Sequence, residues 1–390
     1  MTSDRALTIV NRHYPPNPGI TGESAWDLAK YLIEQHHIQV NIVHIDRTYA
    51  GGGQVRRPVG ETYAVKTIYE GNNGLLRLVA GLLDGFLLLR KALAVRQGPL
   101  LVMTSPPMLP FWAAILLGRR IPYWLWAMDL FPEGFAAEGK VSPANFLYRW
   151  VIRKTYRHAP EWLIALGPEQ AAHIRAKYQR PDLPTIVLPC GVLMHQDRDP
   201  QPPAWRTDNT KVYLGYAGNL GQPHSAEFLL SVIRHLDPQR YHLVLALYGE
   251  KADEVIRAAS GQKGITLLKH IPRSQLHYLD LQLVSLLPHW THIAVPSKAV
   301  SAVCAGSPIL FYGSRESDSY VLLQEAAFLI DAARDMDGQI LAFLRELTPA
   351  LLATRKMAAA HVAEQLQQSV TSAYQTLARL ITGNTLKIIK

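Results

Sequence analysis

Short apolar runs alternate with helical patterns along the whole chain, and this alternation restarts once. The first series of apolar runs ends near residue 166, and the second begins at residue 211. Such alternation is typical of parallel β-sheets flanked by helices. We therefore predict an α/β protein with two doubly wound parallel-sheet (Rossmann-like) domains. Ligands bind at the carboxyl ends of the strands in such sheets, so a cleft that the two domains face is the expected active site.

The stretch between the two series predicts a linker, because it is rich in Pro, Asp and Gln and has no periodicity. The 390 residues are enough for two domains that each bury a core. The tract "GGGQVRR" (51–57) predicts a flexible loop. The predicted bounds are an N-terminal domain over 1–195, a linker over 196–210, a C-terminal domain over 211–348 and C-terminal helices over 349–390 that pack back toward the N-terminal domain.

The expected elements follow from the two periodicities. Strands are predicted at 6–11, 38–45, 62–68, 99–104, 121–128 and 162–166. In the second series, 211–221 is predicted as a strand that runs into a glycine-containing turn, and further strands are predicted at 242–249, 265–271, 281–287, 308–313 and 328–331. The clearest helices are predicted at 23–35, 74–96, 144–158 and 225–236, with one or two more over 349–381.

Composition and charge limit the class of protein. The net charge of +9 and pI near 9.4 suit phosphate-bearing ligands, anionic lipids or nucleic acid. Only two cysteines are present, Cys190 and Cys304, which indicates a reducing compartment and no thiolate metal site. The apolar stretch Leu100–Leu117 is interrupted by prolines, and the N-terminus has no signal-peptide pattern, so we expect a cytoplasmic protein without a membrane-spanning segment.

Two motifs of the second domain point to a phosphate site. "YAGNLGQPHSAEFLL" (216–230) places Gly218, Asn219 and Gly221 between a strand and a helix, where glycine lets the backbone approach a phosphate. "HIAVPSKAVSAVCAGSPIL" (292–310) places a proline, a hydroxyl and an ammonium at the start of a helix. A buried helix with an ordinary Ser cap is the alternative.

Two motifs of the first domain lie at the matching edge of its sheet. "RHYPPNPGITGESAWDLAKYL" (12–32) combines stiff prolines with Gly19 and Gly22 before a helix expected to begin near Glu23. "WAMDLFPEGF" (126–135) ends a strand with Asp129 and Glu133, and carboxylates there can position or deprotonate an acceptor hydroxyl. A loop-ordering acid and a solvated acid are the alternative reading of that pair.

The order of these motifs resembles the GT-B glycosyltransferases, and most closely glycosyltransferase family 4 in its bacterial polysaccharide-assembly branch. That branch reads like "DLWPE" in the first domain and "PSK…LAAG-P-V" in the second, and this chain has "DLFPE" (129–133) and "PSK…CAGSP" (296–308). "LPCGV" (188–192) is similar to the Pro-Asn-Gly-Val junction of the family. The resemblance covers nearly the whole chain.

The resemblance implies a transferase that moves a hexosyl or related sugar from a nucleotide-diphosphate sugar to a glycan or lipid-linked glycan acceptor, usually with retention and here without a metal or other cofactor. It places the donor against Gly218, Asn219, Gly221, His270, Ile271, Pro296, Ser297, Lys298 and Ser301. It places the acceptor side at Gly19, Thr21, Gly22 and Glu23, with Asp129 and Glu133 as the catalytic carboxylates.

The sequence departs from the family pattern at positions that would bind the donor. Ile293 and Ser301 stand where the family often has two glutamates, the second of which contacts the ribose. Gln222, Pro223 and His224 replace the usual Arg and Lys after the glycine loop, so Lys298 is the expected cation. A nucleotide-sugar epimerase of the same architecture and a catalytically silent scaffold therefore remain alternatives.

Two further features concern partners. "NFLYRWVIRKTYRH" (145–158) mixes aromatic and basic residues, and it suits either an interfacial face on an anionic membrane or a packed helix with a solvated basic side. We expect peripheral contact with the inner face of the cytoplasmic membrane. No nucleic-acid-binding module accompanies the charge, and the pair His289 and His292 is a weak metal motif without a third ligand.

Overall fold

The computed structural model describes residues 5–17, 19–46, 55–69, 74–194 and 198–383. Residues 51–54 of the predicted flexible loop lie outside this part of the chain. The chain forms two compact units, one with residues 1–190 and 369–390 and the other with residues 191–368. The division therefore falls at Cys190, before the predicted linker.

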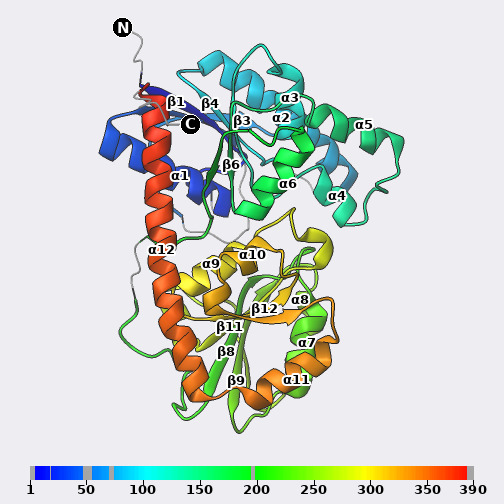
Figure 1. Cartoon of the computed structure of the whole chain (residues 1–390), viewed down its shortest axis with the longest axis vertical. Coiled ribbons are helices and arrows are strands. Elements are labelled where there is room, and N and C mark those ends of the chain that lie inside the picture. Colours follow the sequence, from blue (N-terminus) through cyan, green and yellow to red (C-terminus); the bar gives the residue numbers. More distant parts are fainter. Residues whose placement is uncertain (1–4, 18, 47–54, 70–73, 195–197, 384–390) are drawn as a thin grey trace. The chain divides into compact units, whose positions relative to one another are not determined.

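The N-terminal unit is built on a seven-stranded parallel sheet with the order β3-β2-β1-β4-β5-β6-β7. Its central strands β1 and β4 are buried throughout, because helices lie against the sheet (Figure 1). Burial on both faces explains why these strands are nearly continuous apolar runs, with Thr8 of β1 as the one polar residue. The strands are β1 (Ala6–Val10), β2 (Gln39–Asp46), β3 (Glu61–Lys66), β4 (Leu100–Met103), β5 (Trp124–Trp126), β6 (Trp162–Ala165) and β7 (Thr185–Val187).

Helix α1 connects β1 to β2, and the other helices of this unit connect the successive strands from β3 onward. They are α1 (Ile20–His36), α2 (Gly74–Val95), α3 (Leu109–Leu116), α4 (Glu133–Ala137), α5 (Phe146–Thr155) and α6 (Pro168–Tyr178). Within the described residues no helix has the length and apolar character needed to cross a membrane.

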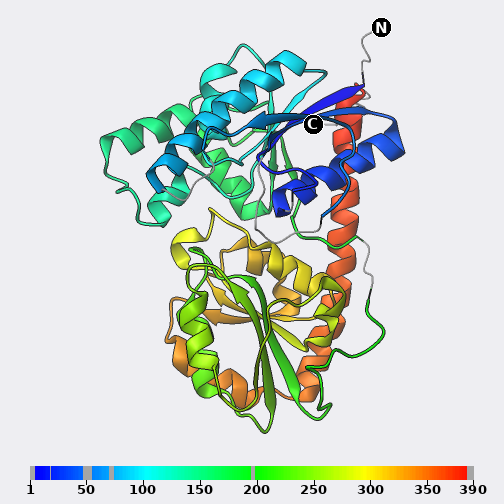
Figure 2. The ribbon, with the colours of Figure 1, turned by 180° about the vertical axis from the view of Figure 1, so that it is seen from behind.

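The C-terminal unit repeats the same plan, with helices lying against a sheet (Figure 2). The six parallel strands of this sheet have the order β10-β9-β8-β11-β12-β13. The order reverses between β8 and β11, which is the switch point at which doubly wound sheets bind ligands. The strands are β8 (Val212–Asn219), β9 (Tyr241–Tyr248), β10 (Ile265–Leu267), β11 (Leu281–Ser285), β12 (Ile309–Gly313) and β13 (Ala327–Asp331). The predicted fold class, two Rossmann-like α/β domains, is confirmed.

The helices of the second unit cover both faces of its sheet. On one face, Phe228 of α7 (Ala226–His235) and Val255 of α8 (Ala252–Ala259) share a buried cluster with Leu214. On the other face, Tyr213 packs with Ile271, as the alternation of side chains along a strand requires. The remaining helices are α9 (Ser297–Cys304), α10 (Asp318–Val321), α11 (Met336–Glu346) and the 3₁₀ helices η1 (Arg273–Tyr278), η2 (Pro288–Trp290) and η3 (Gln324–Ala326).

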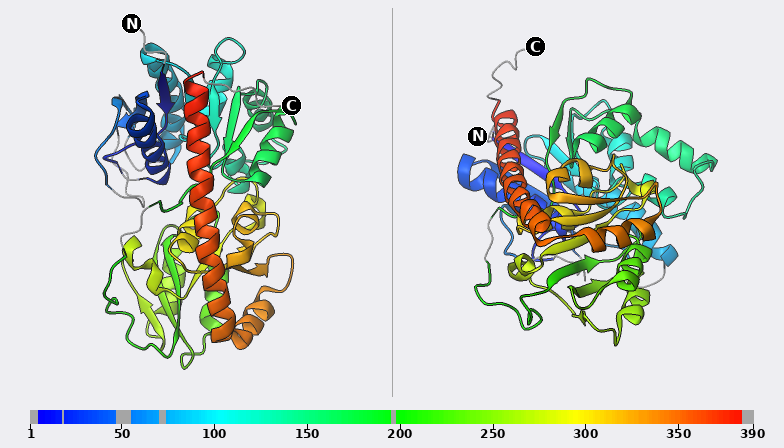
Figure 3. Two further views of the ribbon diagram at one scale, coloured as in Figure 1. Left: turned by 60° about the vertical axis from the view of Figure 1, so that its left-hand side comes forward. Right: turned by 60° about the horizontal axis from the view of Figure 1, so that its bottom comes forward.

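The C-terminal tail is one helix, α12 (Pro349–Ile381), drawn in orange and red in Figure 3. Its residues up to Gln368 belong to the second unit, and those from Ser369 belong to the first. In the first unit, the ring of Tyr374 lies 5.2 Å from that of Tyr31 on α1.

Three expected elements differ from the structure. Helix α1 begins at Ile20 and not near Glu23, so Thr21 and Gly22 lie in its first turn. Strands β5 and β10 are only three residues long, because the loops that follow leave the sheet early. The three-residue strand β7 was not predicted, since a run this short carries no detectable period.

Candidate active site

Lys298 joins the two motifs of the second unit. It is the second residue of α9, and its Nζ donates hydrogen bonds of 2.6 Å to the Tyr216 hydroxyl and 2.6 Å to the Asn219 carbonyl. The Tyr216 hydroxyl donates to the same carbonyl at 3.0 Å. The start of α9 therefore lies at the carboxyl end of β8, beside the switch point of the sheet.

The ammonium of Lys298 has no compensating carboxylate among the described residues. Burial alone lowers its pKa to about 7. Its Nζ also lies 4.3 Å from the centre of the Tyr216 ring, and burial raises the pKa of that phenol, so Tyr216 stays neutral. An ammonium carries three N–H donors, and the two hydrogen bonds above use two of them. The third N–H and the positive charge are available to an anion.

The first turn of α9 adds backbone donors to this charge. Pro296 is its N-cap and provides no side-chain cap, so the alternative of an ordinary Ser cap is wrong. Uncapped N–H groups at a helix start favour negative charge. Gly191, with a φ of +83°, packs against Ser297 so closely that a Cβ would lie 2.5 Å from the Ser297 carbonyl oxygen. The hydroxyl of Ser301 donates to the Gly191 carbonyl at 2.8 Å, so Ser301 holds this junction in place.

A second lysine holds the loop that follows β8. Lys251 Nζ donates to the carbonyls of Gln222 at 2.9 Å and His224 at 2.8 Å. Nδ1 of His224 lies 2.6 Å from the Ser285 carbonyl. Burial and the charges of Lys298 and Lys251 hold the pKa of His224 well below its usual value, so its imidazole is neutral. The loop is thus fixed before any ligand arrives.

Glycines let the backbone close around this loop. Gly218 has a φ of +123°, a conformation that other residues rarely adopt, and it lies beside the Lys298 side chain. Gly249, after β9, has a φ of +108°, and a Cβ there would lie 2.1 Å from Oδ1 of Asn219. Gly221 has no such constraint, since its nearest neighbours are side-chain atoms of Asn219 at 3.2 Å and beyond.

The predicted base-side residues lie in the loop after β10. His270 is exposed, whereas Ile271 is buried in the cluster with Tyr213. The side chain of Ile271 is therefore covered and not available to a ligand at this edge.

The predicted acceptor-side loop of the first unit is compact. Gly19 is the N-cap of α1, and Thr21 accepts a 3.3 Å hydrogen bond from Asn11. A Cβ on Gly22 would lie 3.0 Å from the His13 backbone, so the close approach requires glycine. Glu23 is buried, with its carboxylate 4.0 Å from the Arg56 guanidinium.

The two predicted catalytic carboxylates, Asp129 and Glu133, lie in different environments. Asp129 follows β5, and its carbonyl accepts a 2.9 Å hydrogen bond from Thr104. Its side chain is exposed at the surface, but the protein around the carboxyl raises its pKa to about 6. Glu133, the first residue of α4, is only 5% exposed. Burial raises the pKa of Glu133, and the hydroxyl of Tyr156 lowers it in part. The buried Glu133 and the exposed Asp129 correspond to the loop-ordering acid and the solvated acid of the alternative interpretation.

Three residues that build the second-unit loop were not predicted from the sequence: Tyr216, Gly249 and Lys251. A signal was present for the last two. "GEK" (249–251) directly follows a strand, so it lies at the same edge as the glycine loop. Among the described residues, no three His, Cys, Asp or Glu side chains are grouped as metal ligands. His289 lies in η2, and the positive charge of Lys251 adds to burial in lowering its pKa.

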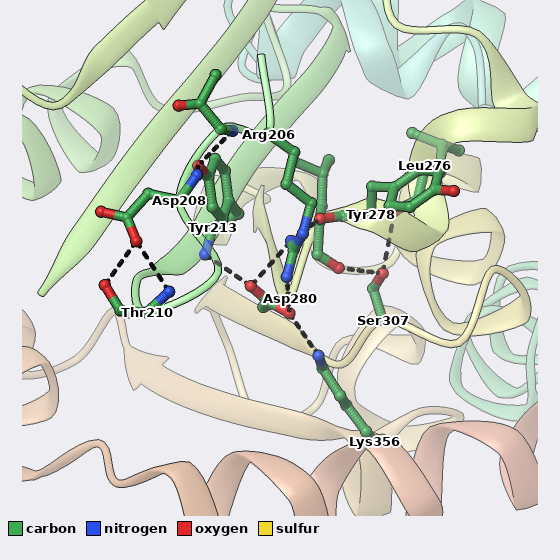
Figure 4. A network of polar contacts seen from close by, with 11 residues as sticks. Arg206, Asp208, Thr210, Tyr213, Leu276, Tyr278, Asp280, Ser307 and Lys356 are labelled. Atoms are coloured by element: carbon green, nitrogen blue, oxygen red, sulfur yellow. Dashed lines mark hydrogen bonds and ion pairs between the residues drawn. The ribbon is translucent and has the colours of Figure 1, made fainter. Parts of the chain in front are cut away.

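The opposite edge of the same sheet has a different kind of charge cluster, shown in Figure 4. Asp280, just before β11, accepts hydrogen bonds from the Tyr213 amide at 2.8 Å, Arg206 at 3.2 Å and Lys356 at 2.5 Å. The guanidinium of Arg206 also donates to the Tyr278 carbonyl. Each cation here meets a carboxylate, and the cluster fastens the segment before β8 and α12 to the sheet.

Comparison with known proteins agrees with this geometry. Residues 21–191 match the family model of the glycosyl transferase 4-like domain. No curated protein matches the sequence. One similar solved structure is WaaG, described as a glycosyltransferase involved in lipopolysaccharide biosynthesis, with 15% identity and a TM-score of 0.65 over 97% of this chain and 100% of that one.

Two other similar structures cover both units as fully. One is an E. coli structure described as trehalose-6-phosphate bound with UDP-2-fluoro glucose, with 13% identity and a TM-score of 0.68 over 98% of this chain and 99% of that one. The other is sucrose-phosphate synthase from Thermosynechococcus elongatus, with 12% identity and a TM-score of 0.70 over 98% and 100%. The predicted resemblance in fold is confirmed: the chain has the two-domain GT-B fold of these structures, and its residues 21–191 match the model of the glycosyl transferase 4-like domain.

Proposed function

We propose that the chain moves a sugar from a nucleotide-diphosphate sugar to a polysaccharide-precursor or lipid-linked acceptor, with retention of configuration and without a metal ion. The observation that carries the proposal is the ammonium of Lys298, which lies at the carboxyl end of β8 with no carboxylate partner among the described residues. Anions are favoured at such a position because the backbone N–H groups of α9 add to the charge.

Sugar transfer needs the positive charge of Lys298 at the step in which the diphosphate leaves. As the bond between the anomeric carbon and the diphosphate oxygen breaks, the electron pair moves to the diphosphate. The acceptor oxygen forms the new bond to the anomeric carbon, and its proton leaves to a base or to the departing phosphate. Lys298 and the first amides of α9 stabilise the charge that develops on the diphosphate, and preorganised donors are well suited to this task.

The donor class is supported by a structural neighbour. The E. coli structure was solved with UDP-2-fluoro glucose bound, and its fold matches 98% of this chain. The Asn219 loop is already fixed by Lys251 and His224, so binding a diphosphate needs little rearrangement there. A loop that is already ordered favours affinity, because little conformational entropy is lost when the diphosphate binds.

The acceptor class is supported by two observations on the first unit. Asp129 is an exposed carboxylate after β5, where it can orient an acceptor hydroxyl. WaaG, whose fold matches 97% of this chain, is involved in lipopolysaccharide biosynthesis. We propose that the acceptor is a related glycan that is carried on a lipid at an anionic membrane surface.

A silent scaffold is the second candidate, and one observation favours it. Ser301 stands where the family often has a ribose-binding glutamate, and its hydroxyl is already used by the Gly191 carbonyl. The chain therefore has no carboxylate at that position of α9.

A donor panel separates these functions. The protein is incubated with UDP-, GDP-, ADP- and dTDP-sugars, and thermal shift and product formation are measured. We expect one class to raise the Tm and to be hydrolysed slowly without an acceptor, because water can replace the acceptor hydroxyl. An altered sugar without loss of the nucleotide identifies an epimerase. Absence of both binding and turnover with every donor contradicts the proposal and supports the scaffold.

A further inference from the structure

Tyr248, the last residue of β9, presents an aromatic ring at the carboxyl end of the C-terminal sheet. It is 42% exposed, whereas Tyr213, Tyr216 and Tyr241 of the same sheet are each at most 1% exposed. The seven residues that precede Tyr248 in β9 are buried or half-buried. Doubly wound sheets bind their ligands at the carboxyl ends of the strands, so an open aromatic side chain at this end is placed to contact a ligand.

Tyr248 lies beside the anion site of the second unit. It is paired with Asn219 in the parallel register of β8 and β9, and its carbonyl accepts a 2.7 Å hydrogen bond from the Leu220 amide. The Asn219 carbonyl in turn accepts from Lys298 at 2.6 Å. Burial raises the pKa of Tyr216, whose hydroxyl accepts from the same lysine, and the nearby Tyr248 adds to this shift. Tyr248 is therefore a neighbour of both residues that hold Lys298.

The ring of Tyr248 belongs to the face of the sheet that carries the predicted base-side loop. Side chains alternate along a strand, so Tyr248 shares a face of β9 with Val244 and Ala246. These two residues form a buried cluster with Ile271, which lies in the loop after β10, and Leu268 of the same loop packs against that cluster. The ring and the base-side loop are therefore on the same side of the sheet.

The order of the strands puts Tyr248 between the two ends of a bound nucleotide. Strand β9 lies between β10, which leads into the base-side loop, and β8, whose carboxyl end meets Lys298 (Figure 1). Neighbouring strands are about 5 Å apart, so the ends of β8 and β10 are separated by about 10 Å. A nucleotide with its diphosphate at Lys298 and its base toward residues 270–271 crosses the end of β9, where the ring lies.

We propose that the nucleobase of the donor stacks on the ring of Tyr248. Every nucleobase has a π-face, and one stack between a base and an aromatic side chain strengthens binding by a factor of about 5 to 100. This affinity compensates for the missing ribose carboxylate at Ser301, whose hydroxyl is held by the Gly191 carbonyl. The inference rests on the proposed function, since it concerns how the same donor site binds its nucleotide.

The test is isothermal titration calorimetry of the full chain with UDP, ADP, GDP, dTDP and inorganic pyrophosphate. In Tyr248→Ala we expect the affinity for the preferred nucleoside diphosphate to fall about 5- to 100-fold, because one stack is lost. The affinity for pyrophosphate, which has no base, should stay unchanged in this variant. Tyr248→Phe should bind both ligands like the wild type, because the face of the ring and not the hydroxyl makes the stack.

Leu267→Ala is the matched control, since Leu267 is 39% exposed at the end of the neighbouring strand β10. It lies two residues after Ile265, which packs on the cluster that contains Phe228 of α7 and Val255 of α8. Alternation therefore directs Leu267 to the opposite face of the sheet from Tyr248. Its truncation should leave the affinity for nucleoside diphosphates unchanged.

The outcomes separate the stacking proposal from the proposed function. A nucleoside diphosphate that binds the wild type and binds Tyr248→Ala as tightly overturns the stacking proposal and leaves the proposed function standing. Equal losses for the nucleoside diphosphate and for pyrophosphate also overturn it, because Tyr248 then shapes the anion site and does not hold a base. A loss in Tyr248→Phe as large as that in Tyr248→Ala assigns the effect to the hydroxyl and overturns it as well. A wild type that binds none of the five ligands contradicts both proposals.

Discussion

Two groups of cations at opposite edges of the C-terminal sheet differ in their partners. At the amino edge, Asp280 accepts from both Arg206 and Lys356, so both of these positive charges have a carboxylate partner. At the carboxyl edge, Lys298 donates to a phenol and a carbonyl and has no carboxylate partner among the described residues. The compensated charges of Arg206 and Lys356 hold the unit together, whereas the charge of Lys298 is available to an anion. This contrast indicates which of the two sites is structural and which is functional.

The largest effect is expected at the amino edge. Asp280→Ala removes the acceptor of two cations whose side chains are only 17% and 38% exposed. Leaving buried charge unpaired is strongly destabilising, so we expect a loss of about 3 kcal/mol in the free energy of unfolding. Urea denaturation measures this loss, and donor affinity should stay unchanged because the other edge is untouched.

Glu227→Ala is the control for that variant. Glu227 pairs with Arg234 on the surface, with both side chains about half exposed, so its removal should cost less than about 1 kcal/mol. If Asp280→Ala is as stable as Glu227→Ala, the amino-edge network has no structural role.

The next largest effect on stability is expected at Gly249, beside the carboxyl edge of the sheet. Gly249→Ala puts a Cβ 2.1 Å from Oδ1 of Asn219, at a φ of +108°. Backbone strain and the clash together should destabilise the chain by about 2 kcal/mol and weaken donor binding. Gly261→Ala tests the strain alone, since Gly261 has a φ of +75° and no atom within 4 Å of an added Cβ. Equal losses in the two variants would show that Asn219 is not displaced.

The smallest effect is a pH dependence of donor affinity. Burial lowers the pKa of Lys298 to about 7, so its ammonium is present below pH 7 and is lost as the pH rises. A diphosphate binds the charged form, and we expect its affinity to fall about tenfold or more between pH 7 and 9. Isothermal titration calorimetry at several pH values measures the slope. Lys298→Arg keeps its charge and should lose this slope, so a common slope in both proteins contradicts the assignment.

Much of the fold could be predicted because it depends on local patterns. The two series of apolar runs predict two parallel sheets, and "GN-x-G" and "PSK" both follow strands that meet at one edge. Their contact through Lys298 and Asn219 is a consequence of that topology.

What could not be predicted depends on packing between distant segments. Glu133 and Asp129 look alike in the sequence, but α5 and α6 bring Tyr156 and Tyr178 over Glu133 and leave Asp129 exposed. The role of Ser301 depends in the same way on Gly191, which is 110 residues away in the chain.

The central claim is that Lys298 neutralises the diphosphate of the donor. Isothermal titration calorimetry with UDP, ADP and GDP at pH 6.5 tests it in the wild type, in Lys298→Ala and in the control Lys263→Ala, whose lysine is exposed in the turn before β10. Losing a charge-assisted hydrogen bond should weaken binding of the preferred nucleotide about 10- to 100-fold in Lys298→Ala and leave Lys263→Ala unchanged. A nucleoside diphosphate that binds Lys298→Ala as tightly as it binds the wild type would contradict the account.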